Sequence, residues 1–156
     1  MISIKDLSEI KKIKRAIVFV PMSGDIIHYG HIRILKKSKK LGSVIVGLMT
    51  DRGLESYKGK PLMKFNHRKE IISEIKTVNY VIPLKGLKYL EICKILQPDY
   101  FVHGTDWRKG TQKKVRSMLI KNQKVWKGKV KEFTSTKNIT STNLKKNYLK
   151  KLIKKF

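Results

Sequence analysis

The sequence predicts an α/β fold, a single domain built on a Rossmann-like, doubly wound parallel sheet of about five strands. Three observations carry this prediction. The chain has 156 residues, 40% of them hydrophobic, which suits one domain with one sizeable core. Short β-branched runs bounded by Gly, Pro or Asp indicate strands. These runs alternate with segments of helical periodicity, which implies βαβ crossovers and parallel strands covered on both faces.

Five segments are expected to form the strands. The first two, RAIVFV and SVIVGLM, are largely apolar runs typical of buried strands. The third and fourth, NYVIPL and DYFVH, are shorter, and the fifth, KVKEF, is the weakest. In chain order the five segments are residues 15–20, 43–49, 79–84, 99–103 and 129–133.

Helical patterns occupy the segments between the strands. Residues 31–41 show the spacing well, since Ile34, Leu35 and Leu41 recur at helical intervals. The helices expected between the strands are residues 31–41, 66–77, 87–96 and 111–124.

The chain divides into three parts. Residues 1–14 form an N-terminal extension that is expected to be helical, and residues 15–143 form the main domain. Residues 144–156 are a basic amphipathic helix, expected to pack on its own domain or on a second subunit, with docking on an anionic membrane as the alternative.

The cellular setting predicted from the sequence is cytoplasmic. Residues 1–14 alternate apolar and charged side chains and lack the apolar core of a secretory signal. No run reaches the roughly 18 apolar residues that would span a membrane. The single cysteine, Cys93, cannot form an internal disulfide and is expected to be a buried thiol.

Polar segments that carry the useful motifs follow four of the predicted strands. They comprise residues 22–31, 50–60, 104–110 and 134–142. Ligands of doubly wound sheets bind beyond the carboxyl ends of the strands. We therefore expect these four segments to form one site.

The segment 22–31 carries the clearest chemistry. His28 and His31 are three residues apart, so they share one face of the first turn of a helix that begins near Tyr29 or Gly30. The free N–H groups and positive dipole at a helix N-terminus suit a phosphate, and Gly30 allows close approach to the backbone. Two imidazoles at this point would stabilise a phosphoryl group under attack. The alternatives are a surface pair or half of a metal site, although a lone H-x-x-H is a poor zinc motif.

This segment resembles the G-x-F-D-x-x-H-x-G-H signature of the HxGH cytidylyltransferase family, which includes glycerol-3-phosphate, phosphoethanolamine and phosphocholine cytidylyltransferases. Asp25, His28, Gly30 and His31 match the signature, whereas Met22 replaces its first glycine. Gly24 stands in the place of the phenylalanine.

Three later segments resemble the same family. Residues 55–60 with 65–70 resemble its lysine loop and the following helix, and residues 102–107 (VHGTDW) resemble its G-D-D-W loop. Residues 136–142 resemble its R-T-x-G-I-S-T helix start. The resemblance covers about residues 15–143 and is strongest to the nucleotidyltransferases associated with phosphonate metabolism.

Substitutions within these motifs put some contacts in doubt. Lys76 and Asn79 replace an arginine and an aspartate of the family, and Thr105 replaces the first aspartate of its loop. Ser135 stands where the family has an arginine, and Lys137 is a nearby substitute without the guanidinium's fork geometry.

The resemblance implies transfer of CMP from CTP to a small phosphorylated or phosphonylated acceptor, with release of pyrophosphate. Mg²⁺ would arrive with the triphosphate, without a stable protein site and with Asp25 as a candidate ligand. The implied catalytic residues are His28, His31 and Lys58, and the implied acceptor or phosphate ligands are Lys60 and Lys137. The implied nucleotide-binding residues are Ser23, Gly24, Asp25, Gly30, Arg68, Gly104, Asp106, Trp107, Ile139, Thr140, Ser141 and Thr142.

Other interpretations stay open. An adenylyltransferase using ATP is the nearest, because H-x-G-H and hydroxyl-rich helix starts also occur in such enzymes. The G-T-D-W loop and the spacing of Lys58 and Lys60 favour CTP. For Trp107, the alternative to contacting the ligand is packing within the protein. For Lys58 and Lys60, the alternative to binding phosphate is a charged loop exposed to solvent. The resemblance also implies a homodimer.

The high positive charge of the chain is also compatible with a nucleic-acid-binding protein. The 37 Lys+Arg against 11 Asp+Glu give a formal net charge of +26, which attracts polyanions such as nucleic acid. The lysines are spread along the whole chain, so compositional bias is the favoured explanation of the charge. No nucleic-acid-binding motif accompanies the charge, so specific nucleic-acid binding is not expected.

Overall fold

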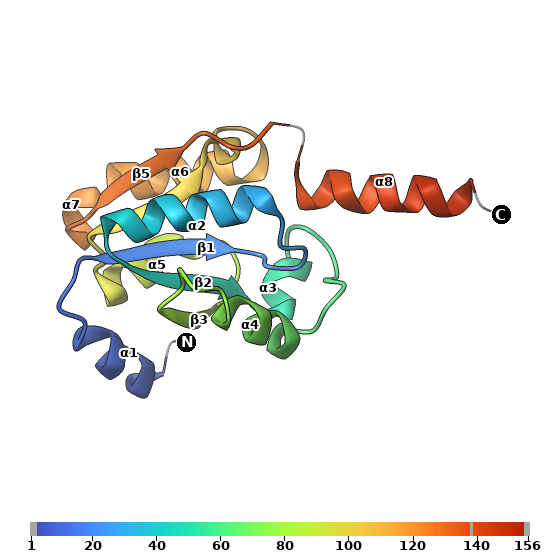
Figure 1. Ribbon diagram of the computed structural model, residues 1–156. Coiled ribbons are helices and arrows are strands. Elements are labelled where there is room, and N and C mark those ends of the chain that lie inside the picture. Colours follow the sequence, from blue (N-terminus) through green and yellow to red (C-terminus); the bar gives the residue numbers. More distant parts are fainter. Residues whose placement is uncertain (1–2, 138, 155–156) are drawn as a thin grey trace.

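A computed structural model describes residues 3–137 and 139–154. Five strands form one parallel sheet in the order β3-β2-β1-β4-β5 (Figure 1). The predicted fold class, an α/β single domain with a Rossmann-like parallel sheet, is confirmed. The strands are β1 (Ile17–Met22), β2 (Ser43–Met49), β3 (Tyr80–Leu84), β4 (Tyr100–Gly104) and β5 (Lys129–Phe133).

Eight α-helices and two 3₁₀ turns lie in the described part of the chain. The helices are α1 (Ile4–Lys11), α2 (Tyr29–Leu41), α3 (Asp51–Glu55), α4 (Phe65–Ser73), α5 (Tyr89–Leu96), α6 (Lys113–Lys121), α7 (Gln123–Trp126) and α8 (Ser141–Ile153). The 3₁₀ turns are η1 (Thr105–Arg108) and η2 (Gly110–Gln112).

The core has two layers, one on each face of the sheet. Val18 and Val20 of β1 point to the face where Leu35 of α2 and Ile72 of α4 are buried. Phe19, between them, points to the opposite face, which is covered by α1, α5, α6 and α7 (Figure 1). This alternation follows from the two-residue period of a strand.

The strand order creates a switch point beside β1. The chain runs outward from β1 to β2 and β3 on one side, then crosses to β4 and β5 on the other. Val18 pairs with Val44 of β2 and with Tyr100 of β4, so β1 lies in the middle of the sheet. Connections leave in opposite directions beyond the carboxyl ends of β1 and β4, which opens a crevice there.

Most differences from the sequence prediction concern short elements. The helix predicted over residues 111–124 is divided into η2, α6 and α7, with a break at Asn122. Asn122 lies at the break with φ −102° and ψ 17°, and both its backbone N–H and its side-chain amide donate to the carbonyl of Met118. Helix α3 and turn η1, each of four or five residues, are too short to show a periodicity.

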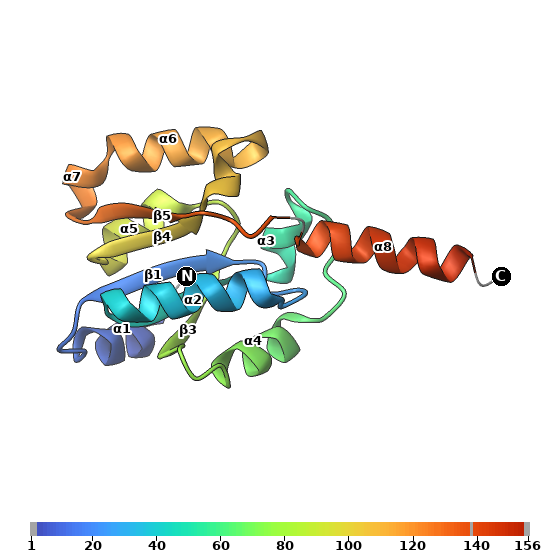
Figure 2. The same cartoon turned by 45° about the horizontal axis from the view of Figure 1, so that its top comes forward.

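Helix α8 extends away from the sheet and its covering helices in both views (Figures 1 and 2). Only its first turns reach the domain, where Ser141 Oγ donates to the carbonyl of Ile26 (3.2 Å). The apolar side chains of Tyr148, Leu149 and Ile153 on α8 are exposed. Within the described residues they therefore do not pack on their own domain, which was one of the two arrangements expected from the sequence. Residues 155–156 lie outside the described residues, and the homodimer stays a prediction.

Among residues 3–137 and 139–154, every helix is too short or too polar to cross a membrane.

Candidate active site

A cleft opens at the switch point, at the carboxyl ends of β1 and β4. It encloses about 900 Å³ together with the solvent at its mouth, a size that accommodates a nucleotide. Residues from β1, α2, β4 and the segment before α8 meet there, as the sequence predicted. The predicted site residues that line it are Ser23, His28, Gly30, His31, Lys58, Gly104, Asp106, Ile139, Thr140 and Ser141.

His28 and His31 form a pair at the start of α2. His28 is the N-cap, and its Nδ1 accepts a hydrogen bond from the backbone N–H of Gly30 (3.1 Å). His31 Nδ1 accepts from the backbone N–H of His28 (3.4 Å), and the two ring centroids are 4.0 Å apart. Because both Nδ1 atoms act as acceptors, each neutral ring carries its proton on Nε2. The pair therefore presents two Nε2–H donors.

Both imidazoles are held neutral. Burial, followed by the charges of His28 and Lys58, lowers the pKa of His31 to about 4. Burial and the charge of Lys58 also lower the pKa of His28. Near neutral pH the pair therefore donates hydrogen bonds without carrying charge, which suits stabilisation of a phosphoryl group in transfer.

Two glycines in this segment are required by its geometry. A Cβ at Gly30 would lie 2.9 Å from Cε1 of His28, so any other residue there would displace the His28 ring. Gly24 has a φ of +64°, and a Cβ there would lie 2.5 Å from Cδ1 of Ile72. Gly24 therefore shapes the turn, and it does not line the cleft.

A smaller lysine-rich pocket adjoins the cleft and shares Ser23, Lys58 and Ser141 with it. Lys145 and Lys146 of α8 also line this pocket. Desolvation, followed by the nearby charge of Lys145, lowers the pKa of Lys58. Thr140 caps α8 by accepting from the N–H of Asn143 (3.0 Å), and Thr142 lies in the same pocket. The arrangement suits a polyanion.

Asp25 connects three segments of the site. Its Oδ1 accepts from the backbone N–H groups of Leu62 (2.7 Å) and Met63 (3.2 Å), and its Oδ2 accepts from Lys145 Nζ (2.5 Å). Burial alone would raise its pKa, but these three hydrogen bonds outweigh it and leave the pKa below the usual value.

The described residues contain no cluster of three or more His, Cys, Asp or Glu side chains that would hold a metal ion. Both oxygens of Asp25, the candidate Mg²⁺ ligand, accept hydrogen bonds from protein donors, and its role toward the metal stays a prediction.

Arg68 requires a correction. The sequence placed it among the nucleotide-binding residues, but its side chain is fully buried and lines neither pocket. The guanidinium donates to Asp51 Oδ1 (2.6 Å) and to the carbonyls of Met49 (2.8 Å), Ser23 (2.5 Å) and Met63 (2.9 Å). It thus holds together the segments that follow β1, β2 and α3.

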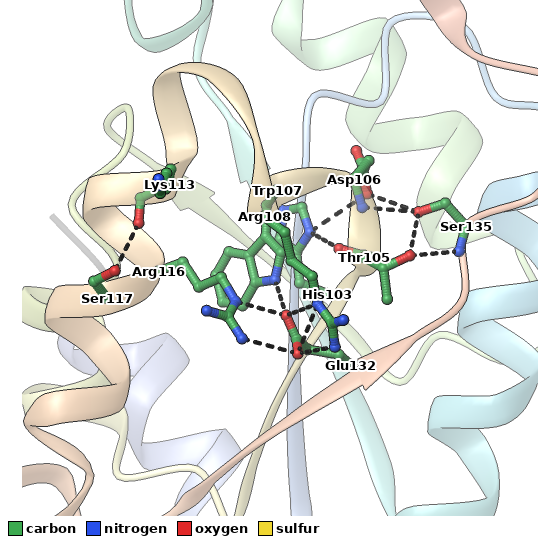
Figure 3. A network of polar contacts seen from close by, with 11 residues as sticks. His103, Thr105, Asp106, Trp107, Arg108, Lys113, Arg116, Ser117, Glu132 and Ser135 are labelled. Atoms are coloured by element: carbon green, nitrogen blue, oxygen red, sulfur yellow. Dashed lines mark hydrogen bonds and ion pairs between the residues drawn. The ribbon is translucent and has the colours of Figure 1, made fainter.

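Trp107 requires a second correction. It is buried, with 1% of its surface exposed, and does not line the cleft, so it does not present a face to a nucleoside. Its indole N–H donates to Glu132 (2.6 Å), which also binds Arg108 and Arg116 (Figure 3). Its ring stacks on His103 at 4.3 Å, so Trp107 supports the wall of the cleft from behind.

Two predicted phosphate ligands do not line either pocket. Lys60 and Lys137 are exposed residues on the segments that flank the site.

Several cleft residues were not predicted from the sequence. They contribute aromatic, imidazole, amide and hydroxyl groups. These residues are Tyr57, Tyr89, His103, Gln112, Ser135 and Thr136. Tyr57, His103 and Thr136 lie inside segments that resemble the family but were not singled out there, and Ser135 was noted only as a substitution. The position of His103 just before the G-T-D-W loop was the signal that could have identified it.

A doubly wound domain with two neutral imidazoles at a helix N-terminus and a lysine-rich pocket beside them defines the class of the HxGH nucleotidyltransferases. Comparison with known families agrees, because residues 23–147 match the family described as cytidylyltransferase-like. The chain belongs to this family.

Similar proteins include two curated relatives. The bifunctional protein HldE of Campylobacter fetus subsp. fetus is 32% identical over 118 residues, which cover 74% of this chain and 25% of the relative. HldE of Nitratiruptor sp. is 34% identical over 115 residues, covering 67% of this chain and 25% of the relative. The chain thus spans about a quarter of the length of these relatives.

Two solved structures are also similar. The lipopolysaccharide core biosynthesis protein of Thermoplasma volcanium has a TM-score of 0.64 and 27% identity, covering 78% of this chain and 98% of that one. The pantoate-beta-alanine ligase of Francisella tularensis has a TM-score of 0.63 and 19% identity, covering 93% and 74%. The second likeness shows the fold alone.

Proposed function

We propose that this chain transfers a nucleoside monophosphate, AMP ahead of CMP, from a nucleoside triphosphate to the phosphate of a small acceptor. The observation that carries the proposal is the pair of Nε2–H donors of His28 and His31 at the start of α2, inside the switch-point cleft. Such donors stabilise negative charge that develops on a phosphoryl group.

The reaction is an in-line displacement at the α-phosphorus. An oxygen of the acceptor phosphate forms a new bond to that phosphorus, and the bond from it to the bridging oxygen of the β-phosphate breaks. Pyrophosphate leaves with the electron pair, so a phosphoanhydride joins nucleotide and acceptor. Because the acceptor oxygen is already ionised near neutral pH, the reaction needs no strong general base.

The chain's own residues have distinct parts in this scheme. His28 and His31 donate to the non-bridging oxygens of the α-phosphate. Lys58 and the hydroxyl-rich start of α8 bind the β- and γ-phosphates. Mg²⁺ would arrive with the nucleotide and would neutralise charge on the triphosphate.

The nucleotide proposed here is ATP, in place of the CTP that was expected from the sequence. The expectation of CTP rested on the G-T-D-W loop and on the spacing of Lys58 and Lys60, but Trp107 is buried and Lys60 lies outside both pockets. The similarity to the HldE proteins supports the adenylyl alternative.

For the acceptor, the relative of Thermoplasma volcanium supports a phosphorylated sugar. That relative is described as a lipopolysaccharide core biosynthesis protein, and 78% of this chain aligns with it. We therefore rank sugar phosphates ahead of the phospho-amines and phosphonates that the sequence resemblance suggested.

Pyrophosphate release tests the proposal. ATP, CTP, GTP and UTP are each combined with sugar phosphates, glycerol phosphate, phosphoethanolamine and a phosphonate in the presence of Mg²⁺. Release with ATP and one acceptor is expected. Release with CTP alone would instead support the transfer of CMP that was expected from the sequence. Salt-sensitive RNA binding without release under any condition would favour the nucleic-acid-binding class.

A further inference from the structure

Helix α8 carries an apolar stripe that the described part of the chain leaves open to solvent. Tyr148, Leu149 and Ile153 are between 57% and 75% exposed, and Leu152 is also exposed. Their spacing places all four side chains on one side of the helix. The end of α8 that carries them lies away from the sheet and its covering helices (Figures 1 and 2). These four residues, which we call the α8 stripe, are therefore free to contact another surface.

Lysines border the α8 stripe on both sides. Lys146 lies three residues before Leu149, and Lys151 lies three residues after Tyr148, so each is a neighbour of the stripe on the helix surface. Residues 141–154 contain no Asp or Glu. An apolar face bordered by lysines, on a helix without acidic side chains, is typical of helices that lie in the interface of an anionic membrane.

The loop before α4 repeats this pattern. Leu62 is 70% exposed, and the exposed residues Lys60 and Lys64 flank it. Asp25 connects the loop to α8, because its Oδ1 accepts from the N–H of Leu62 (2.7 Å) and its Oδ2 accepts from Nζ of Lys145 (2.5 Å). Two exposed apolar elements with adjacent lysines therefore lie at one edge of the molecule.

A second copy of the chain suits this edge less well than a lipid surface. Pairing two α8 helices would bring together lysines without acidic partners. The chain has only 11 Asp+Glu against 37 Lys+Arg. Several of its carboxylates are already engaged, since Asp51 pairs with Arg68, Asp25 with Lys145 and Glu132 with two arginines. Anionic headgroups supply the negative charge that a second copy largely lacks.

We propose that Leu62 and the α8 stripe dock together on the surface of an anionic lipid bilayer. The apolar side chains enter the boundary between headgroups and acyl chains, and the adjacent lysines contact lipid phosphates. Helix α8 has 13 residues and a length of about 20 Å, short of the roughly 30 Å of a hydrocarbon core, so it lies on the membrane without crossing it. This edge is distinct from the switch-point cleft, and the inference does not depend on the proposed function.

Flotation of the full chain with lipid vesicles tests the apolar contribution. One set of vesicles is phosphatidylcholine with about one quarter phosphatidylglycerol, and the other is phosphatidylcholine alone. The double variant Tyr148→Gln/Ile153→Gln and the loop variant Leu62→Gln each remove apolar contacts, and glutamine preserves helix propensity. Val125→Gln, which changes an exposed apolar residue of α7, is the matched control.

A second pair of variants tests the contribution of charge. Lys151→Gln/Lys154→Gln removes two lysines from α8, whereas Lys36→Gln/Lys40→Gln removes two exposed lysines from α2. Both variants lose the same net charge. A difference in vesicle binding between them therefore reports where the charge lies and not how much charge the molecule carries.

The wild-type protein is expected to bind the anionic vesicles at least roughly tenfold more tightly than the neutral ones. Tyr148→Gln/Ile153→Gln should lower binding to the anionic vesicles roughly tenfold, and Leu62→Gln should lower it several-fold. Val125→Gln should match the wild type. Loss of the two α8 lysines should weaken binding more than loss of the two α2 lysines.

Four results would overturn the inference. The first is no binding of the wild-type protein to anionic vesicles, and the second is equal binding by the wild type and the apolar variants. The third is an equal effect of the two lysine pairs, which would assign binding to the overall charge. The fourth is a wild-type dimer, seen by sedimentation without vesicles, that Tyr148→Gln/Ile153→Gln converts to a monomer, since the α8 stripe would then be a subunit interface. Pyrophosphate release is measured without vesicles, so none of these results decides the proposed function.

Discussion

Two backbone N–H groups determine which nitrogen of His28 and His31 carries the proton. By donating to Nδ1 of His28 and His31, they leave Nε2–H on each ring directed at a ligand. Replacing either histidine with alanine should lower kcat roughly 100-fold or more, because one preorganised donor is lost. Pyrophosphate release measures the effect. His67→Ala, on the exposed part of α4, is the control. Wild-type kcat in His28→Ala and His31→Ala would contradict the assignment.

His31 also makes stability depend on pH. Its pKa is about 4 in the folded protein, against an ordinary value of 6.5, because of burial and of the charges of His28 and Lys58, which Asp106 only partly offsets. Between these two pKa values His31 is protonated in the unfolded chain but not in the folded protein. The free energy of unfolding therefore falls as pH drops through 6.5 toward 4. Between pH 7 and pH 5 the loss should be about 2 kcal/mol.

Urea unfolding at both pH values measures this loss. In His31→Gln the difference between the two pH values should shrink by that amount, since glutamine does not titrate. An unchanged difference would show that His31 is not the group responsible.

Among the connections between elements, that of Arg68 is expected to contribute most to stability. Its guanidinium joins Asp51 to the segments after β1, β2 and α3. Arg68→Met would leave three carbonyls without their buried donor and should lower the free energy of unfolding by about 3 kcal/mol or more. Arg52→Met, which changes an exposed arginine of α3, should have little effect. Equal stability of the two variants in urea would show that Arg68 has no such role.

Helix α8 depends on a different contact. Lys145 pairs with buried Asp25, and few other contacts hold the helix to the domain. Lys145→Met should therefore increase amide exchange in the first turns of α8 and raise the KM for the nucleotide several-fold, whereas Lys150→Met, further along the exposed face, should not. Hydrogen exchange measured by mass spectrometry separates the two. Identical exchange in both variants would contradict a tethering role for Lys145.

The strands and the histidine motif could be predicted from the sequence because their signals are local. Predicted strand bounds agree with β2 and β5 and differ by at most two residues elsewhere. A glycine turn between a buried strand and a helix likewise fixed the place of His28. Burial of a polar side chain is not a local property. The same sequence pattern is compatible with Arg68 or Trp107 facing a ligand or facing the core, and only the fold decides.

The wall of the cleft formed by Tyr89, His103 and Gln112 was not predicted, for a related reason. Tyr89, His103 and Gln112 are separated along the chain and belong to α5, β4 and η2. They meet because the two halves of the sheet diverge at the switch point, which gathers side chains from several connections. No spacing pattern in the sequence indicates that these side chains lie close together.

At the scale of the whole molecule, the net charge of +26 acts on every anionic ligand. Attraction between a basic protein and a polyphosphate weakens as salt screens it, and the Debye length falls from about 10 Å at 0.1 M to about 3 Å at 1 M. If the charge assists binding, the KM for the nucleotide should rise several-fold between 50 and 300 mM NaCl while kcat changes little. A neutral solute that raises the viscosity equally is the control, because it slows encounter without screening charge. A salt-independent KM would mean that Lys58 and its immediate neighbours suffice and that the other lysines reflect composition alone. If the KM rises with NaCl but not with the neutral solute, the positive charge of the whole molecule assists nucleotide binding, an effect that no single residue accounts for.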